Sequence, residues 1–113
     1  MHELGVANEV LAAVLSEAER NAARKVTAVT LRVGVLRAIE ADHLTFLFDH
    51  LARGTPADGA RLSILADPVR VDCPSCGAQD ALSVPWQCPR CGGQRIAATG
   101  GDALEIVSLE IDV

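Results

Sequence analysis

Apolar and polar positions along the chain repeat with two different periods, and the longer period predicts two helices. From Leu4 to about Ala23, apolar residues recur every three or four positions with charged residues between them, which is the pattern of an amphipathic helix with one buried face. The same spacing returns from Ala41 to about Arg53, and Gly54 is expected to end this second helix. The apolar side of the second helix consists of Leu44, Leu47, Phe48 and Leu51.

The shorter period, in which apolar and polar residues alternate, predicts three strands. The segment VTAVTLRVG (26–34) places Val29, Leu31 and Val33 on one side and polar residues on the other. Residues 60–66 and 103–112 show the same alternation. In the last segment the pattern changes phase between Ile106 and Val107, which predicts a β-bulge.

The order of these elements predicts the fold class. Three strands with two amphipathic helices favour an α/β fold, namely a two-layer three-stranded sheet with two helices on one face. An insert of different character, rich in Cys, Pro and Gly, separates the second and third strands. We therefore expect an α/β domain formed by residues 1–69 and 102–113, and an inserted module formed by residues 70–101.

The insert has too few apolar residues to form a core of its own, so another interaction is expected to hold it together. Trp86 is interpreted as its one large packing residue. The apolar residues of the insert are Val71, Leu82, Val84, Trp86 and Ile96.

Two copies of the motif C-P-x-C-G lie within the insert, as CPSCG (73–77) and CPRCG (88–92). Two residues between paired cysteines allow both thiolates to reach one ion from a tight turn, and four thiolates in a tetrahedron suit Zn²⁺. Gly77 and Gly92 can adopt a positive φ, so that backbone N–H groups point toward the sulfurs. The motifs predict a zinc-ribbon-like module with a structural, closed zinc site. The predicted ligands are Cys73, Cys76, Cys88 and Cys91.

Other interpretations of the cysteines explain the motifs less well. A thioredoxin-type redox pair needs one such motif at the start of a helix, whereas this chain has two glycine-ended copies. Iron remains an alternative to zinc, because thiolates bind both metals. The four charged residues of 71–101 sum to zero, so a four-thiolate zinc centre would make the module negative and favour protein over phosphate contact.

Composition and charge weigh against a nucleic-acid-binding, a membrane-spanning and a secreted protein. The net charge of −5 weighs against nucleic-acid binding, which usually requires a basic patch. No apolar run approaches the roughly 18 residues of a membrane span. No secretory signal peptide is expected, because His2 and Glu3 directly follow Met1. A cytoplasmic location is therefore expected, where four cysteines are metal ligands or redox groups more often than disulfides.

The first residues, MHE, form a candidate chelate for a second metal. The bulk of His2 disfavours removal of Met1, so the terminal amine, the His2 amide and the His2 imidazole could close two adjoining rings around one ion. The Glu3 amide or carboxylate could supply a fourth position. Such a nitrogen-rich planar set suits Ni²⁺ or Cu²⁺. Taken alone, MHE is better explained by a solvated terminus than by a chelate.

The combination of MHE, this order of helices and strands, and a CxxC…CxxC insert before the last strand resembles the HypA/HybF hydrogenase-maturation nickel chaperones. The resemblance covers the whole chain, and the segment GTPADGARLSI is similar to the stretch that leads into the second strand of that family. It implies Ni²⁺ held at His2 with help from Met1 and Glu3, together with structural Zn²⁺ at the four cysteines. It also implies two partners, a HypB-type nickel GTPase and the [NiFe]-hydrogenase large subunit precursor.

Some expectations stay open at this point. Some members of the family use a second histidine near the zinc module as a nickel ligand, but this chain has no histidine beyond His50. His43 and His50 share one side of the second helix and are either a further metal site or, more commonly, polar residues of an outer face. A homodimer is an open alternative to a monomer. The rival functions are a zinc-ribbon adaptor for protein or nucleic acid, and an enzyme, for which no nucleophile–base pair or phosphate loop is present.

Overall fold

The computed structural model describes residues 3–83 and 85–113, and both predicted helices are present. Helix α1 (Glu3–Arg20) ends three residues earlier than its apolar pattern predicts. Ala22 adopts φ 52°, and the N–H of Ala23 donates to the carbonyl of Ala18 at 2.9 Å, which closes the helix in a Schellman motif. Helix α2 (Ala41–Ala52) agrees with its prediction, and the Glu40 carboxylate accepts hydrogen bonds from the first turn.

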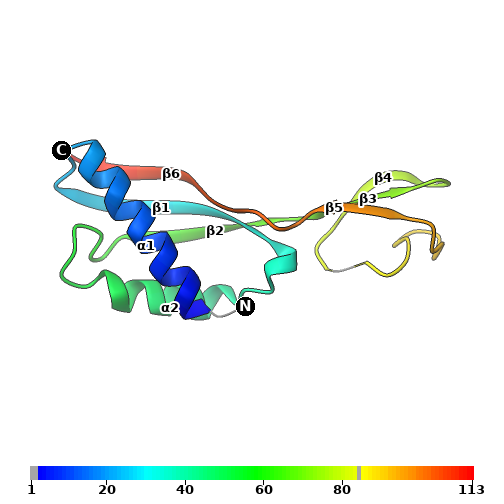
Figure 1. The fold of residues 1–113 in the computed structure, drawn as a ribbon, viewed down its shortest axis with the longest axis horizontal. Helices are drawn as coiled ribbons and strands as arrows, with labels where there is room; N and C mark the ends of the chain where they lie inside the picture. Colours follow the sequence, from blue (N-terminus) through cyan, green and yellow to red (C-terminus); the bar gives the residue numbers. More distant parts are fainter. Residues whose placement is uncertain (1–2, 84) are drawn as a thin grey trace.

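The main sheet places β1 (Lys25–Gly34) between two other strands (Figure 1). Strand β2 (Arg61–Asp67) pairs with it in parallel, through a crossover that contains α2 and the short 3₁₀ helix η1 (Val35–Arg37). Strand β6 (Leu104–Asp112) pairs with β1 antiparallel and forms an edge. Along this pairing Thr30 faces Ser108 and Leu31 faces Ile106, so Val107 is the extra residue of a bulge. The predicted bulge is confirmed.

Helices α1 and α2 pack against each other and bury their apolar sides with the inner side of β1. The predicted α/β layer is confirmed, but two residues expected on the buried side of the first helix, Leu4 and Ala22, are exposed. Leu4 is 52 % exposed, because the buried stripe of α1 begins at Val6. The largest fully buried residues of this core are Val14, Val26, Val29, Leu31, Leu44 and Phe48.

A second three-stranded sheet, which the sequence pattern did not predict, lies in the insert. Its strands are β3 (Val69–Cys73), β4 (Gly77–Ala81) and β5 (Ala97–Gly100), in the antiparallel order β4-β3-β5. The short strands GAQDA and AATG carry almost no large apolar residues, which explains why no alternation signalled them.

The interpretation of Trp86 as a packing residue is wrong, since its side chain is 85 % exposed. Among the described residues of the insert, the buried hydrophobic side chains are Val71, Cys73 and Cys88, joined by Val69 at its border. This apolar surface is too small to enclose an indole ring.

The two sheets lie end to end in an elongated molecule of 53 × 24 × 16 Å (Figure 1). Strand β2 passes into β3 through Pro68 alone, and the return segment 101–103 runs beside η1. The N–H of Gly34 donates to the Ala103 carbonyl and the N–H of Leu36 to the Gly101 carbonyl, each at 2.7 Å. A Cβ on Gly34 would lie 2.1 Å from the Gly101 oxygen, so this crossing requires glycine. No helix in the described part of the chain is long and apolar enough to cross a membrane.

Candidate metal centres

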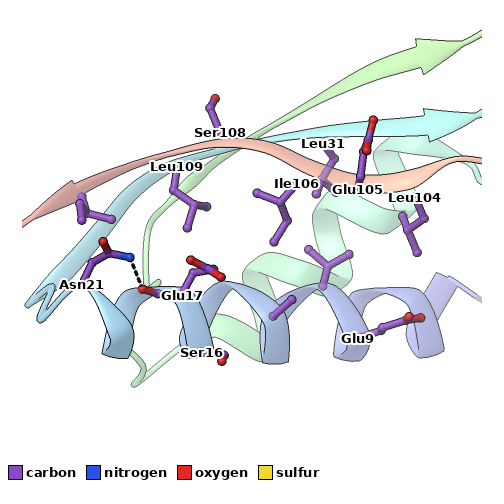
Figure 2. Close-up of a pocket in the computed structure, with 13 residues that line it drawn as sticks. Glu9, Ser16, Glu17, Asn21, Leu31, Leu104, Glu105, Ile106, Ser108 and Leu109 are labelled. Atoms are coloured by element: carbon purple, nitrogen blue, oxygen red, sulfur yellow. Dashed lines mark hydrogen bonds between the residues drawn. The ribbon is translucent and has the colours of Figure 1, made fainter.

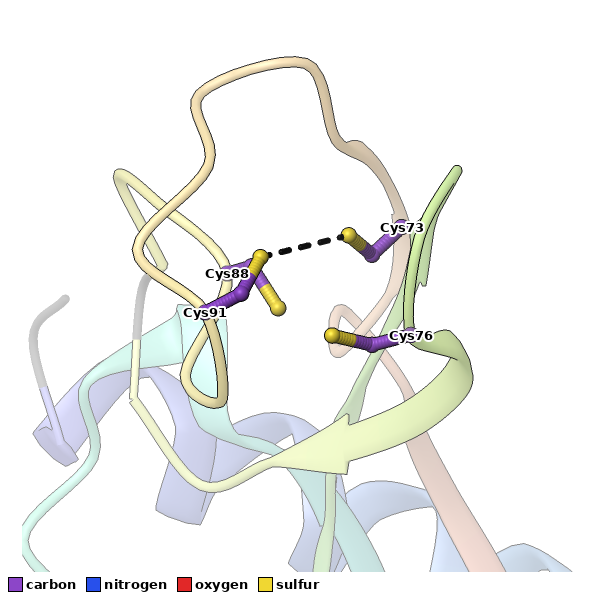
Figure 3. Close-up of side chains that lie close together, drawn as sticks. All are labelled: Cys73, Cys76, Cys88 and Cys91. Atoms are coloured by element: carbon purple, nitrogen blue, oxygen red, sulfur yellow. Dashed lines mark hydrogen bonds between the residues drawn. The ribbon is translucent and has the colours of Figure 1, made fainter.

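The two C-P-x-C-G motifs form two facing turns. Cys73 ends β3 and Cys76 lies in the turn before β4, while Cys88 and Cys91 lie in a second turn outside the sheet. Gly77 and Gly92 follow these turns with φ values of 82° and 75°, as predicted. Figure 3 shows the four side chains pointing toward a common centre.

The sulfur geometry fits a zinc ion bound by four thiolates. The four Sγ atoms lie within 4.8 Å of one another, and those of Cys73 and Cys91 are 3.8 Å apart. A tetrahedron with Zn–S bonds of about 2.3 Å has S···S edges of about 3.8 Å. The cluster leaves no open ligand position, so it fits the structural rather than the catalytic type of zinc site.

Hydrogen-bond donors surround two of the sulfurs. The Gln79 side-chain amide donates to Cys88 Sγ at 3.2 Å, and the N–H groups of Arg90 and Gly93 donate to Cys88 and Cys91, each at 3.4 Å. Such outer contacts orient ligands and stabilise thiolate charge. Sequence reasoning missed Gln79, because only the pairing of β3 with β4 brings it to the second turn.

The same contacts separate the acidities of the thiols in the metal-free protein. The backbone N–H of Cys91 lowers the pKa of Cys88 to about 6, with further help from Arg90 and Gln79 that outweighs burial. Hydrogen bonds with the Cys91 and Cys88 sulfurs, followed by burial, raise the pKa of Cys76 to about 12. Cys88 therefore ionises more readily than Cys76.

The predicted nickel site falls partly outside the described residues, because Met1 and His2 are not among them. Glu3 is described and is the first residue of α1. Its Oε1 lies 3.1 Å from Nδ1 of His43, in the first turn of α2, and its side chain is only 16 % exposed. Burial raises the pKa of Glu3, but hydrogen bonds from His43 and from the N–H groups of Glu3 and Glu40 lower it overall. The fold thus brings together two residues that are 40 positions apart.

His43 and His50 do not form a second metal site within the described residues, where the one group of three or more candidate ligands is the cysteine cluster. Both histidines are exposed on α2. This agrees with the interpretation of an outer polar face.

A groove of about 620 Å³ lies between α1 and β6 (Figure 2). Ile106 and Leu109 of β6 line one side of it and face α1. Its polar lining consists of carboxylates, hydroxyls and one amide, without histidine, cysteine or lysine. The groove therefore has neither a nucleophile–base pair nor a metal-binding set.

Fold and cysteine cluster together define a small zinc-binding α/β protein. A family model described as "Hydrogenase/urease nickel incorporation, metallochaperone, hypA" matches residues 1–111. The chain belongs to the HypA family, and it is accordingly a nickel metallochaperone of hydrogenase maturation, with nickel as cargo and zinc as structural metal. The resemblance seen in the sequence is confirmed, and the zinc-ribbon adaptor is not favoured. The family comprises maturation factors, which points to a non-catalytic role.

Relatives with this name match over their full length. The hydrogenase maturation factor HypA of Azotobacter chroococcum is 36 % identical, with 99 % of this chain and 100 % of the relative covered. That of Alkalilimnicola ehrlichii is 39 % identical with the same coverage. The solution structure of the nickel metallochaperone HypA from Helicobacter pylori has the same fold, with a TM-score of 0.68 at 23 % identity over 99 % of this chain and 98 % of that one.

Proposed function

We propose that the chain binds Ni²⁺ at its amino terminus, through the Met1 amine, the His2 amide and imidazole, and the Glu3 amide. The observation that best supports this proposal is that helix α1 begins at Glu3, directly after His2. The family match begins at residue 1, and Glu3 is the first residue of α1. The first N–H groups of a helix have no partner within the helix, so metal binding at this amide disturbs the helix little.

Zinc has a separate, structural role in this proposal. Cys73, Cys76, Cys88 and Cys91 are its ligands, and the ion stabilises a module of residues 70–101 that has little core of its own. The α/β domain of residues 1–69 and 102–113 presents the nickel site. No step of the transfer requires catalysis by the chain itself.

Delivery is proposed to run by protein–protein contact in the cytoplasm. A HypB-type nickel GTPase and the [NiFe]-hydrogenase large subunit precursor are the proposed partners, which the maturation role of the family supports. Co-purification of each partner with zinc-loaded chain, with and without Ni²⁺, tests this part. Absence of both complexes would overturn the proposed route.

A two-residue extension tests the terminal chelate. Gly-Ser placed before Met1 converts the ligating amine into a peptide nitrogen, while all side chains stay in the protein. We expect this variant to lose nickel affinity as fully as His2→Ala, by at least about a hundredfold, because a ligand is removed and the remaining atoms are out of register.

The matched control carries the same Gly-Ser after Val113 and should bind nickel as the unchanged chain does. Zinc content, measured by elemental analysis, should be equal in all four proteins. Full nickel affinity in the N-terminally extended protein would show that the amine is not a ligand.

A further inference from the structure

One hydrogen bond joins the amino-terminal ends of the two helices. Glu3 lies in the first turn of α1 and His43 in the first turn of α2, with 3.1 Å between Glu3 Oε1 and His43 Nδ1. The Glu3 side chain is 16 % exposed, whereas that of His43 is 53 % exposed. The Glu3 side chain is therefore mostly shielded from solvent, whereas the imidazole that contacts it is about half exposed.

The neighbouring acidic residue is already engaged. The carboxylate of Glu40 accepts the N–H groups of Asp42 and His43 at 3.2 and 2.6 Å and so caps α2. The side chains of Glu40 and Asp42 are carboxylates, although the backbone N–H of Glu40 also donates a hydrogen bond to Glu3. His43 is the side chain that supplies a donor to Glu3 among the described residues.

We propose that His43 is a positioning residue for the terminal nickel site, and that it holds the Glu3 carboxylate as an anchor so that Glu3 offers only its backbone amide to the metal. This inference rests on the proposed function. The hydrogen bond to His43 restricts the conformations of Glu3, the residue that directly follows His2 in the chain. It thereby restricts the conformations in which the terminal chelate can form. A site whose ligands are held in place before binding loses less conformational entropy when the metal arrives.

A double-mutant cycle tests the proposal. His43→Leu removes the donor, Glu3→Ala removes the acceptor but keeps the backbone amide, and the third protein carries both changes. Loss of a residue that hydrogen-bonds to a metal ligand lowers metal affinity by about 10–100-fold. We expect the lower value here, because the His43 side chain is about half exposed. We expect each single variant to bind Ni²⁺ about tenfold more weakly, and the double variant to be no weaker than either, because both remove the same contact.

Two further variants separate positioning from other roles. His43→Asn keeps an N–H donor close to the position of Nδ1 and should restore most of the affinity, with an unchanged nickel absorption spectrum. His50→Leu removes an exposed histidine from the same side of α2 and should leave affinity unchanged. Zinc content and the far-ultraviolet helix signal should be equal in all variants.

Each other outcome overturns the proposal. If Glu3→Ala weakens nickel binding far more than His43→Leu, the carboxylate is a ligand. If His43→Asn changes the spectrum and does not restore affinity, His43 itself is a ligand. Binding that depends on His2 but not on His43 defeats this inference and leaves the proposed function intact, whereas binding that is indifferent to His2→Ala defeats both.

Discussion

Replacing Gly34 by alanine tests how the two sheets are joined. Gly34 has φ −68° and ψ 140°, a conformation that any residue adopts, so backbone strain plays no part in this substitution. The added Cβ would lie 2.1 Å from the oxygen and 2.2 Å from the carbon of the Gly101 carbonyl. Because these are backbone atoms, no side-chain rotation can relieve the contact, and the segment 101–103 must move.

The expected cost follows from that displacement. Overpacking of a tight contact costs about 1–3 kcal/mol. Movement of the segment also weakens the hydrogen bonds to the Gly101 and Ala103 carbonyls, which contribute about 0.5–1.5 kcal/mol each. The free energy of unfolding should therefore fall by about 2–6 kcal/mol. At roughly 4 °C per kcal/mol for a chain of this length, the melting temperature should fall by about 8–24 °C.

Thermal unfolding of the zinc-loaded, nickel-free protein, followed by circular dichroism, measures the effect. Gly5→Ala is the matched control, because a Cβ at Gly5 meets nothing within 4 Å and Gly5 lies in α1. Alanine is the better helix former by up to about 1 kcal/mol, so the control should be unchanged or slightly stabilised. A Gly34→Ala protein that melts within about 2 °C of the unchanged chain would refute the close crossing of η1 and the return segment.

Two further predictions concern the metals. Cys76→Ser should release zinc and disorder residues 70–101, because it removes one of the four zinc ligands. The circular-dichroism signal of α1 and α2 should remain, because these helices pack on the main sheet and not on the zinc module. Loss of most of the helix signal would contradict this prediction. Nickel affinity should fall as the pH is lowered from about 8 to about 5.5, because the amine and the imidazole must both be deprotonated to bind the metal. The ordinary pKa of an α-amine is about 7.7–8.0 and that of an imidazole is about 6.5. Glu3 stays charged over this range, because its pKa lies below its ordinary 4.5. The stabilisation from its hydrogen bonds is present above pH 4.5 and is lost only as the pH falls through the lowered pKa. A flat affinity across the range would exclude an amine–imidazole site.

Local patterns predicted much of the fold. The spacing of apolar residues identified α1, α2 and all three strands of the main sheet, and the phase change after Ile106 identified the bulge at Val107. These signals can be read from the sequence because a helix or a half-buried strand places every third, fourth or second side chain on one face. The end of α1 could not be read in this way, because it depends on the left-handed conformation of Ala22, which no glycine marks.

Two strands of the zinc module could not be predicted by the same method, because β4 and β5 contain only small and polar residues. Strand β3 does alternate, with Val69, Val71 and Cys73 buried, but it was interpreted as part of the insert and not as a strand. Trp86 was misjudged for a related reason. A large apolar residue is buried only if enough surface surrounds it, and the sequence does not show how little surface the module offers.

The sequence by itself determined the chemistry of this protein, because ligand type and spacing are local properties. Two cysteines separated by two residues can reach one ion in any fold that allows the turn, and the MHE terminus carries its proposed ligands on consecutive residues. Only the tertiary structure decided which distant residues support that chemistry. Gln79 beside Cys88, Gly34 against Gly101, and His43 beside Glu3 are contacts between segments whose separation along the chain carries no periodic signal. They arise when the core packs the helices and sheets together, and they place the carboxylate that follows His2 within hydrogen-bond distance of an imidazole on the other helix.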